Sequence, residues 1–203
     1  IKSFNADPIS AFGGIVALNQ KCTAEIAHEI NKVFTEIVIA PFFENEALKI
    51  FKRKKNLRVL QVRDLKNRNL KLEVRNIDGG LLVQDVDIKT LKKTDLDIVT
   101  DRKPSSGEVE TALFTWKVLK HAKSNGILIA KEKTTVGLGA GQVSRVDAVH
   151  MALKKGKDRV DGGVLASDAF FPFRDSIDAI GKSGIKMVIQ PGGSIKDNEV
   201  IDA

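Results

Sequence analysis

Short apolar runs alternate with segments of helical period along most of the chain, and this alternation limits the fold more than any other feature. The apolar runs predict buried strands at residues 15–18, 37–40, 57–62, 127–130, 135–138, 164–166 and 185–189. The periodic segments predict helices at residues 23–34, 45–54, 106–122, 144–153, 176–182 and 197–203. Strands that alternate with helices in this way indicate an α/β fold.

The order of these elements suggests two units of similar build. Residues 37–60 read as strand, Phe- and Pro-containing loop, helix and strand, and residues 164–189 repeat that order. The similarity is either an internal repeat or the repetition that α/β chains show routinely. Residues 101–107 (DRKPSSG) are the best linker, so we expect a first subdomain at 1–100 and a second at 101–203. Between residues 64 and 100 only the turn signal Asp78-Gly79-Gly80 is clear.

Composition bounds the class of protein. The 203 residues are 42% hydrophobic and 29% charged, which suits a globular core and excludes collagen-like or wholly disordered chains. The longest stretch without charge runs from residue 8 to residue 20, too short for a membrane helix of about 20 residues. The single cysteine, Cys22, allows no internal disulfide, so we expect a cytoplasmic protein. A start without methionine and an end inside an apparent helix suggest part of a longer protein.

The net charge of +7 favours anionic ligands. Much of the excess lies between Lys49 and Arg58, which raises an alternative function: a non-catalytic nucleotide- or RNA-binding α/β module. Nucleic-acid surfaces usually interleave basic residues with aromatic ones, whereas this chain has no Tyr and its only Trp lies in a helix pattern. We therefore expect a solvated helix end there, and no nucleic-acid partner.

Several familiar motifs are incomplete. The glycine run at 137–142 lacks the last glycine of the dinucleotide fingerprint, and Gly181-Lys182-Ser183 lacks the upstream glycine of a phosphate loop. His28, His121 and His150 are scattered, and one cysteine cannot form a Cys-x-x-Cys pair. We expect no metal site.

Three segments are candidates for a site. Residues 124–126 (SNG) join a helix to a strand, a common place for functional residues, although an Asn there also suits a structural turn. Residues 139–145 offer backbone amides, a helix N-terminus and an arginine, which suit an anionic group. Residues 166–175 hold three Phe, two Asp and an Arg, and predict either a flat-ring pocket or a buried loop plug in which Asp175 caps the next helix.

Seven longer strings then follow one another in the order seen in a known family. They are DPISAFGGIVALNQ (7–20), EIVIAP (36–41), KNLRVL (55–60), KSNGILIA (123–130), VGLGAGQVSRVDAV (136–149), SDAFFPFRDSID (167–178) and QPGGSIKD (190–197). On these strings the chain closely resembles the transformylase region of the AICAR transformylase/IMP cyclohydrolase family over nearly its whole length. The resemblance is weakest at 64–100.

The resemblance implies a specific reaction and assembly. Members transfer a formyl group from the cosubstrate 10-formyltetrahydrofolate to the 5-amino group of AICAR, giving FAICAR for IMP synthesis, and a cyclohydrolase domain, absent from this chain, then closes the ring. The implied fold is two cytidine-deaminase-like three-layer α/β/α subdomains. The implied state is a homodimer with active sites at its interface, and no catalytic metal, nucleic acid or membrane is involved.

Site residues carry over by motif position. The resemblance implies that the AICAR-contacting residues are Gly13, Glu36, Asn125, Arg145 and Phe170. It implies that the folate-contacting residues are Val146, Asp175, Ser194 and Ile195. Asn125 would support catalysis, but a carboxamide cannot act as a base.

One departure from the family affects activity. The family's proton-transfer pair is a Lys-His in a KH-x-x-P-x-G motif, and these 203 residues contain no such motif. The only Lys-His dipeptide, Lys120-His121, falls in a predicted helix, where consecutive side chains point about 100° apart. We expect the chain alone to have little or no transformylase activity.

Overall fold

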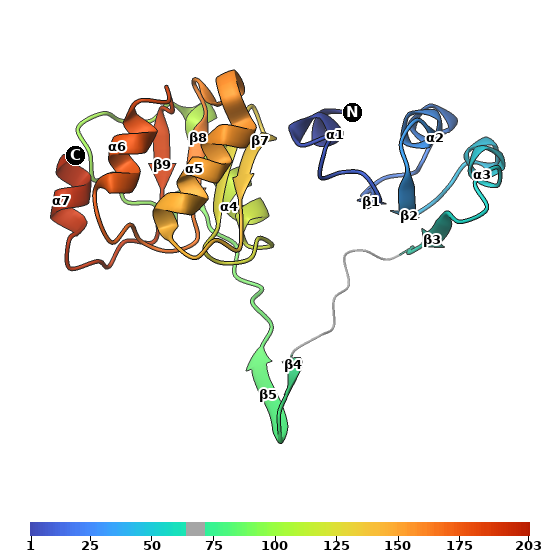
Figure 1. Cartoon of the computed structure of the whole chain (residues 1–203), viewed down its shortest axis with the longest axis horizontal. Helices are drawn as coiled ribbons and strands as arrows, with labels where there is room; N and C mark the ends of the chain where they lie inside the picture. The colour runs from blue at the N-terminus through green and yellow to red at the C-terminus, as the bar shows by residue number, and fades with distance from the viewer. Residues whose placement is uncertain (64–71) are drawn as a thin grey trace. The chain divides into compact units, whose positions relative to one another are not determined.

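A computed structural model describes residues 1–63 and 72–203 and divides into two compact units (Figure 1). The first unit comprises Ile1 and Pro8–Lys89, and the second comprises Lys2–Asp7 and Thr90–Ala203. Apart from Ile1, the first unit therefore lies in the sequence between two segments of the second. The assignment of deaminase-like subdomains to 1–100 and 101–203 stays a prediction.

The first unit contains a parallel three-stranded sheet. Its strand order is β1 (Gly14–Ala17), β2 (Thr35–Ala40), β3 (Arg58–Gln61). Helices α2 (Ala24–Asn31) and α3 (Asn45–Phe51) follow β1 and β2 in the chain and pack on the sheet, as expected for crossover connections between parallel strands.

Side-chain alternation places the core of this unit on one face of the sheet. Val38 and Ala40 of β2 are fully buried and pack in one cluster with Ala27 of α2 and Phe51 of α3. On the other face, Ile15 stays 61% exposed. Because successive strand residues point to opposite faces, one face of this sheet carries exposed apolar residues.

A two-stranded antiparallel hairpin follows the first sheet. It consists of β4 (Leu72–Ile77) and β5 (Gly80–Asp85), which pair in register across the turn at Asp78-Gly79. Gly79 has φ +75°, which the tight hairpin turn requires, so the turn signal in the sequence is confirmed. Residues 64–71, part of the segment that the sequence left without assignment, lie outside the described residues.

The second unit contains a mixed four-stranded sheet. Its strand order is β7 (Thr134–Gly139), β6 (Ile127–Lys131), β8 (Val164–Ser167), β9 (Met187–Ile189). Strand β6 runs antiparallel to both neighbours, whereas β8 and β9 are parallel. All four residues of β8 are buried, as a central strand requires.

Helices cover both faces of this sheet and give three layers (Figure 1). Helix α4 (Ser106–Leu119) packs on one face, and α5 (Arg145–Gly156) and α6 (Asp175–Gly181) pack on the other. Ile127 and Ile129 belong to the core beneath α5, and Leu128 belongs to the core beneath α4. The mixed α/β class predicted from the sequence is confirmed.

Small elements complete the second unit. They are α1 (Lys2–Ala6), the short 3-10 turns η1 (Lys93–Asp95) and η2 (Lys157–Val160), and α7 (Asp197–Asp202). The sequence predicted α7 but not α1, η1 or η2. Within residues 1–63 and 72–203, no helix has the length and apolar character needed to cross a bilayer.

The predicted end of the helix at residues 106–122 is wrong, and this changes the surroundings of the Lys120-His121 dipeptide. Helix α4 ends at Leu119, so Lys120 is its C-cap and His121 lies beyond it rather than inside it. The amide of His121 donates to Val118 O at 3.0 Å, a tight closing turn of the kind common at helix ends. Trp116, predicted to lie in the core, is partly buried and packs against the core cluster that contains Leu119.

Candidate functional site

Four loops of the second unit meet at one edge of its sheet. Because β6 runs against β7 and β8, its amino end lies at the same edge as the carboxyl ends of the other three strands. The loops at this edge are residues 122–126, 140–144, 168–174 and 190–196. Ligands of α/β sheets bind preferentially in loops beyond the carboxyl ends of strands. This edge is the candidate site.

Arg145, the first residue of α5, lies at the centre of these loops. Only 9% of it is exposed. Its guanidinium donates to the Oδ1 atom of Asn125 at 2.8 Å and to the carboxylate of Asp168. It also donates to the carbonyl oxygen of Gly126 at 3.3 Å. The structure thus brings the predicted residues Asn125 and Arg145 into direct contact.

Asp168 completes this cluster, although no pattern in the sequence assigned it a role. Its carboxylate accepts the backbone N–H of Gly126 at 3.1 Å, and its own N–H donates to Gly126 O at 3.2 Å. Burial alone would raise the pKa of Asp168, but hydrogen bonds from Ser124, Arg145 and Gly126, with the charge of Arg145, lower it overall. Its position as the first residue after a fully buried strand is the signal that could have identified it.

The side chain of Asn125 makes three hydrogen bonds within the protein. Its Nδ2 atom donates to Gln142 O and Val143 O, both at 3.0 Å, and its Oδ1 atom accepts from Arg145. A carboxamide has two donor hydrogens and two acceptor lone pairs on oxygen. One lone pair of Oδ1 therefore remains for a ligand that donates an N–H or O–H.

Three backbone amides of the glycine loop and of the first turn of α5 have partners within the protein, and the anion-binding role of residues 139–145 stays a prediction. The amide of Gly141 donates to Lys123 O at 2.7 Å, and the amide of Gln142 donates to Asn125 O at 3.4 Å. At the start of α5, Ser144 accepts the N–H of Asp147 at 3.1 Å. These amides bind neighbouring loops and the helix cap, so they are not available to cradle a phosphate.

Close packing accounts for the glycines before this loop. A methyl group on Gly139 would overlap the carbonyl oxygen of Ala148, and one on Gly137 would overlap that of Ala152. Both oxygens belong to α5. The glycines therefore let α5 approach β7 closely, and this approach sets the direction from which Arg145 enters the cluster.

Two of the loops at this edge, 168–174 and 190–196, contact each other. Most of the predicted folate residues lie in these loops or next to them. The amide of the fully buried Phe171 donates to Gln190 Oε1 at 2.8 Å. The ammonium of Lys196 lies 4.7 Å from the ring centre of Phe173, a cation–π distance. The loop at 168–174 therefore contacts Arg145 through Asp168 and contacts the loop at 190–196 through Phe171.

The predicted folate residues lie near this edge. Ser194 accepts the amide of Lys196 at 3.1 Å, and the side chain of Ile195 is fully exposed. Val146 is half-buried on α5. Asp175 is the first residue of α6, not the residue before it as the capping interpretation required, and its carboxylate accepts the Ser176 amide at 2.6 Å.

The phenylalanines of residues 166–175 divide between the two interpretations of that string. Phe171 is fully buried, as in a loop plug, whereas Phe173 is 52% exposed. Phe170, predicted to contact AICAR, is 39% exposed. Two of the three rings are therefore accessible to a flat ligand.

Two further predicted AICAR residues lie together in the first unit. Gly13 has φ +71°, which favours glycine, and its amide donates to Phe34 O at 3.0 Å. A side-chain carbon on Gly13 would lie 3.9 Å from the Oε1 atom of Glu36, the second residue of β2. The five predicted AICAR residues thus fall into two groups, one in each unit.

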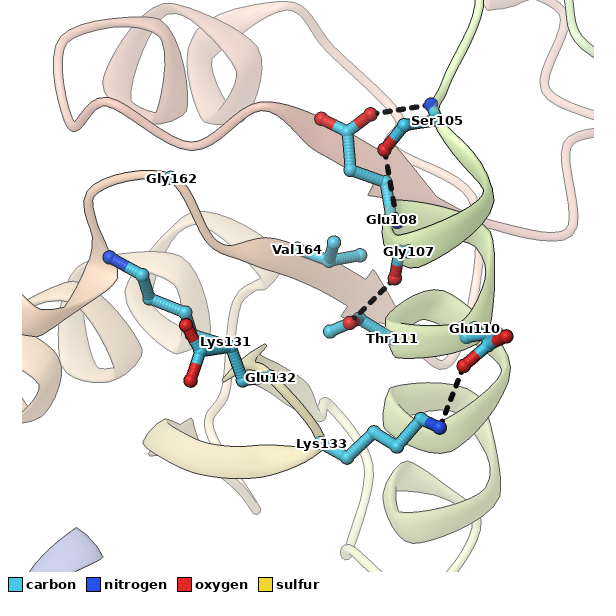
Figure 2. Close-up of a pocket in the computed structure, with 10 residues that line it drawn as sticks. All are labelled: Ser105, Gly107, Glu108, Glu110, Thr111, Lys131, Glu132, Lys133, Gly162 and Val164. Atoms are coloured by element: carbon cyan, nitrogen blue, oxygen red, sulfur yellow. Dashed lines mark hydrogen bonds and ion pairs between the residues drawn. The ribbon is translucent and has the colours of Figure 1, made fainter.

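A hollow of about 490 Å³ lies at the opposite edge of the second sheet (Figure 2). Figure 2 shows Lys133 reaching Glu110, an ion pair of 2.7 Å. Lys131 donates to Asp161 O at 2.7 Å. The hydrogen bond and charge of Lys133 lower the pKa of Glu110. None of the predicted site residues lines this hollow, and its cations are held by protein acceptors.

Metal-binding chemistry has little support in the part of the chain that the structure describes. There, no three His, Cys, Asp or Glu residues lie together in a group that could hold an ion. Cys22 is fully buried. Its burial, and to a smaller extent the negative charge of Glu44, raise the pKa of its thiol. A buried thiol of this kind is a core residue rather than a reactive one. The absence of a metal site stays a prediction.

Comparison with known proteins assigns the family. Residues 1–155 match the model of the family described as the AICARFT/IMPCHase bienzyme. The chain is 50% identical over 202 residues to the bifunctional purine biosynthesis protein PurH of Caldicellulosiruptor saccharolyticus and 50% identical over 206 residues to that of Aquifex aeolicus. These alignments cover 100% of this chain but 39% and 40% of the relatives, so it spans about two fifths of their length. The chain belongs to the AICARFT/IMPCHase bienzyme family.

Proposed function

We propose that this chain belongs to an enzyme that transfers the formyl group of 10-formyltetrahydrofolate to the 5-amino group of AICAR, forming FAICAR. The Asn125–Arg145–Asp168 cluster at the sheet edge, in a chain of this family, carries the proposal. IMP cyclohydrolase activity would belong to a part of the protein outside these 203 residues.

The geometry of Asn125 suits the attacking amine. The AICAR amine carries N–H donors, and the remaining lone pair of Asn125 Oδ1 can accept one of them. This hydrogen bond would turn the nitrogen lone pair toward the formyl carbon. The new C–N bond then forms as the bond to N10 of the folate breaks, and the proton that the amine loses is balanced by the one that N10 gains. Orienting reactants in this way lowers the barrier without moving a proton. Arg145 and Asp168 would hold the carboxamide in place.

The neighbouring loops suit a flat heteroaromatic ligand. Phe170 and Phe173 present exposed rings that could pack on a pterin. The exposed carboxylate of Asp175 could accept hydrogen bonds from pterin amino groups while it keeps the Ser176 amide. These features support the folate assignment of Asp175.

An exposed apolar sheet face supports the expected homodimer. Parallel sheets are usually covered on both faces, yet in the first unit Ile15 and Leu60 are 61% and 47% exposed. We propose that the complete protein is a dimer. Sedimentation equilibrium that finds only monomer at micromolar concentration would contradict this.

The formyl-transfer proposal is tested with the complete gene product that carries this chain. Purified protein should release tetrahydrofolate when given AICAR and 10-formyltetrahydrofolate, and Asn125→Ala should lower kcat/KM at least tenfold, about 1.4 kcal/mol of transition-state stabilisation. His121→Ala is the matched control, because His121 is exposed beyond the end of α4 and outside the cluster. No turnover, together with tight binding of single-stranded RNA, would favour the nucleic-acid alternative.

A further inference from the structure

Both substrates of the proposed reaction are anions, because AICAR carries a phosphate and folates carry glutamate carboxylates. A site for either group needs a cation whose charge the protein has not already neutralised. Arg145 does not meet this condition, because only 9% of it is exposed and it contacts the carboxylate of Asp168. The Arg145–Asp168 pair is neutral as a whole, so it adds no net positive charge to the site.

Two other cations of the site loops are also paired with acids. The guanidinium of Arg174 lies 2.8 Å from the carboxylate of Asp178. The ammonium of Lys196 lies 3.5 Å from the carboxylate of Glu199. Both positive charges are therefore balanced locally.

Lys123, in the loop at 122–126, is the remaining cation. Its side chain is exposed and has no hydrogen bond or ion pair with any residue in the ranges 1–63 and 72–203. The structure describes all four site loops, and of their cations Lys123 is the one whose charge is available to a ligand.

The backbone holds Lys123 beside the glycine loop. The carbonyl oxygen of Lys123 accepts the amide of Gly141 at 2.7 Å. The amides of Asn125 and Gln142 each donate to the other residue's carbonyl oxygen at 3.4 Å. These bonds fix the backbone of Lys123 close to Asn125, whose remaining Oδ1 lone pair is the proposed contact of the AICAR amine.

The aliphatic part of the Lys123 side chain follows the same loop. A side-chain carbon on Gly141 would lie 3.9 Å from Cγ and 3.7 Å from Cδ of Lys123, which is ordinary van der Waals contact. Lysine side chains often lie along a protein surface in this way while the ammonium stays in water. The packed carbons limit where the ammonium can go, and its three N–H donors remain for an oxyanion.

We propose that Lys123 is a specificity-determining residue that binds an oxyanion of a substrate, either the phosphate of AICAR or a glutamate carboxylate of the folate. The assignment rests on the proposed function. A lysine suits either group, because a compact ammonium on a flexible chain needs no fixed fork geometry. Ligands that lack one of these groups distinguish the two sources.

Equilibrium titration of the complete protein tests the assignment without turnover. The ligands are AICAR, its nucleoside without the phosphate, tetrahydrofolate, and tetrahydropteroate, which lacks the glutamate. We expect Lys123→Gln to raise the Kd of AICAR or of tetrahydrofolate at least fivefold and to leave the Kd of the corresponding truncated ligand within twofold. A loss for AICAR identifies the phosphate, and a loss for tetrahydrofolate identifies the glutamate.

Two variants are matched controls. Lys123→Arg keeps the positive charge and should bind both complete ligands within twofold of the wild type. Lys154→Gln removes the same charge from an exposed lysine in the last turn of α5, at the other end of that helix from Arg145, and should leave both Kd values unchanged. Because salt screens exposed charges, added salt should weaken binding of the affected ligand more in the wild type than in Lys123→Gln.

The outcomes separate this assignment from the proposed function. Unchanged Kd values for AICAR and tetrahydrofolate in Lys123→Gln would overturn the assignment. An equal rise for complete and truncated ligands would also overturn it, because a disturbed Asn125 loop gives that result without any lost charge contact. A wild type that binds both ligands but forms no FAICAR contradicts the proposed function alone, while the titrations still decide the role of Lys123. A wild type that binds neither ligand overturns both.

Discussion

The guanidinium of Arg145 donates to the carboxylate of Asp168, and this contact joins the first turn of α5 to the end of β8. Both side chains are largely buried, with 8% and 19% exposed. The same guanidinium holds Asn125, so the orientation of a proposed substrate-binding carboxamide depends on an acid that does not need to touch substrate.

Asp168→Asn should therefore make the free energy of unfolding change less as the pH is lowered from 7 to 3.5. Hydrogen bonds to charged groups contribute about 1.5–3 kcal/mol, so we expect the variant to lose at least about 1 kcal/mol of unfolding free energy at pH 7. The folded state lowers the pKa of Asp168, so this contribution is complete above the unfolded pKa of about 3.9 and is lost as the pH falls through the folded value. Urea titrations followed by Trp116 fluorescence at pH 7 and pH 3.5 measure both proteins. A difference between them that widens at low pH would contradict the assignment.

Gly139→Ala should destabilise the second unit. The new methyl group would overlap the carbonyl oxygen of Ala148, and overpacking of this kind costs about 1–3 kcal/mol. Gly107→Ala is the control: Gly107 lies in α4 with open space around it, so alanine should be neutral or stabilising by up to about 1 kcal/mol. Urea unfolding measures both, and equal effects would show that β7 and α5 are not as close as described.

The 203-residue chain should by itself release tetrahydrofolate far more slowly than the complete protein. Its sequence holds no KH-x-x-P-x-G motif, and its one Lys-His dipeptide lies past the end of α4, outside the Asn125 cluster. The measurement is steady-state turnover at saturating AICAR and 10-formyltetrahydrofolate. Turnover within twofold of the complete protein would place the proton-transfer group inside this chain.

Local patterns predicted most elements of the fold, because a buried strand or a helix face leaves its period in neighbouring residues. Contacts between distant residues left no such trace. The glycines at 137 and 139 were read only as part of an incomplete dinucleotide fingerprint, whereas in the structure they let α5 pack closely on β7. Asp168 bonds residues 23 and 42 positions away, so no spacing rule could assign it. The resemblance named Asn125 and Arg145, but their hydrogen bond to each other is visible only in the folded structure.

Arg145→Lys should be a severe substitution despite its conserved charge. Arg145 bonds Asn125 Oδ1, the Asp168 carboxylate and Gly126 O at once, in the geometry of a planar fork. A lysine ammonium can reach the carboxylate but cannot hold all three, so the Asn125 carboxamide would lose its fixed orientation. We expect kcat/KM of the complete protein to fall at least tenfold, nearly as far as in Arg145→Ala. Arg102→Lys is the control, because Arg102 is exposed and lies outside the cluster, and it should leave the rate within twofold. Wild-type kinetics in Arg145→Lys would show that charge alone suffices and that the three-way contact has no part in the reaction.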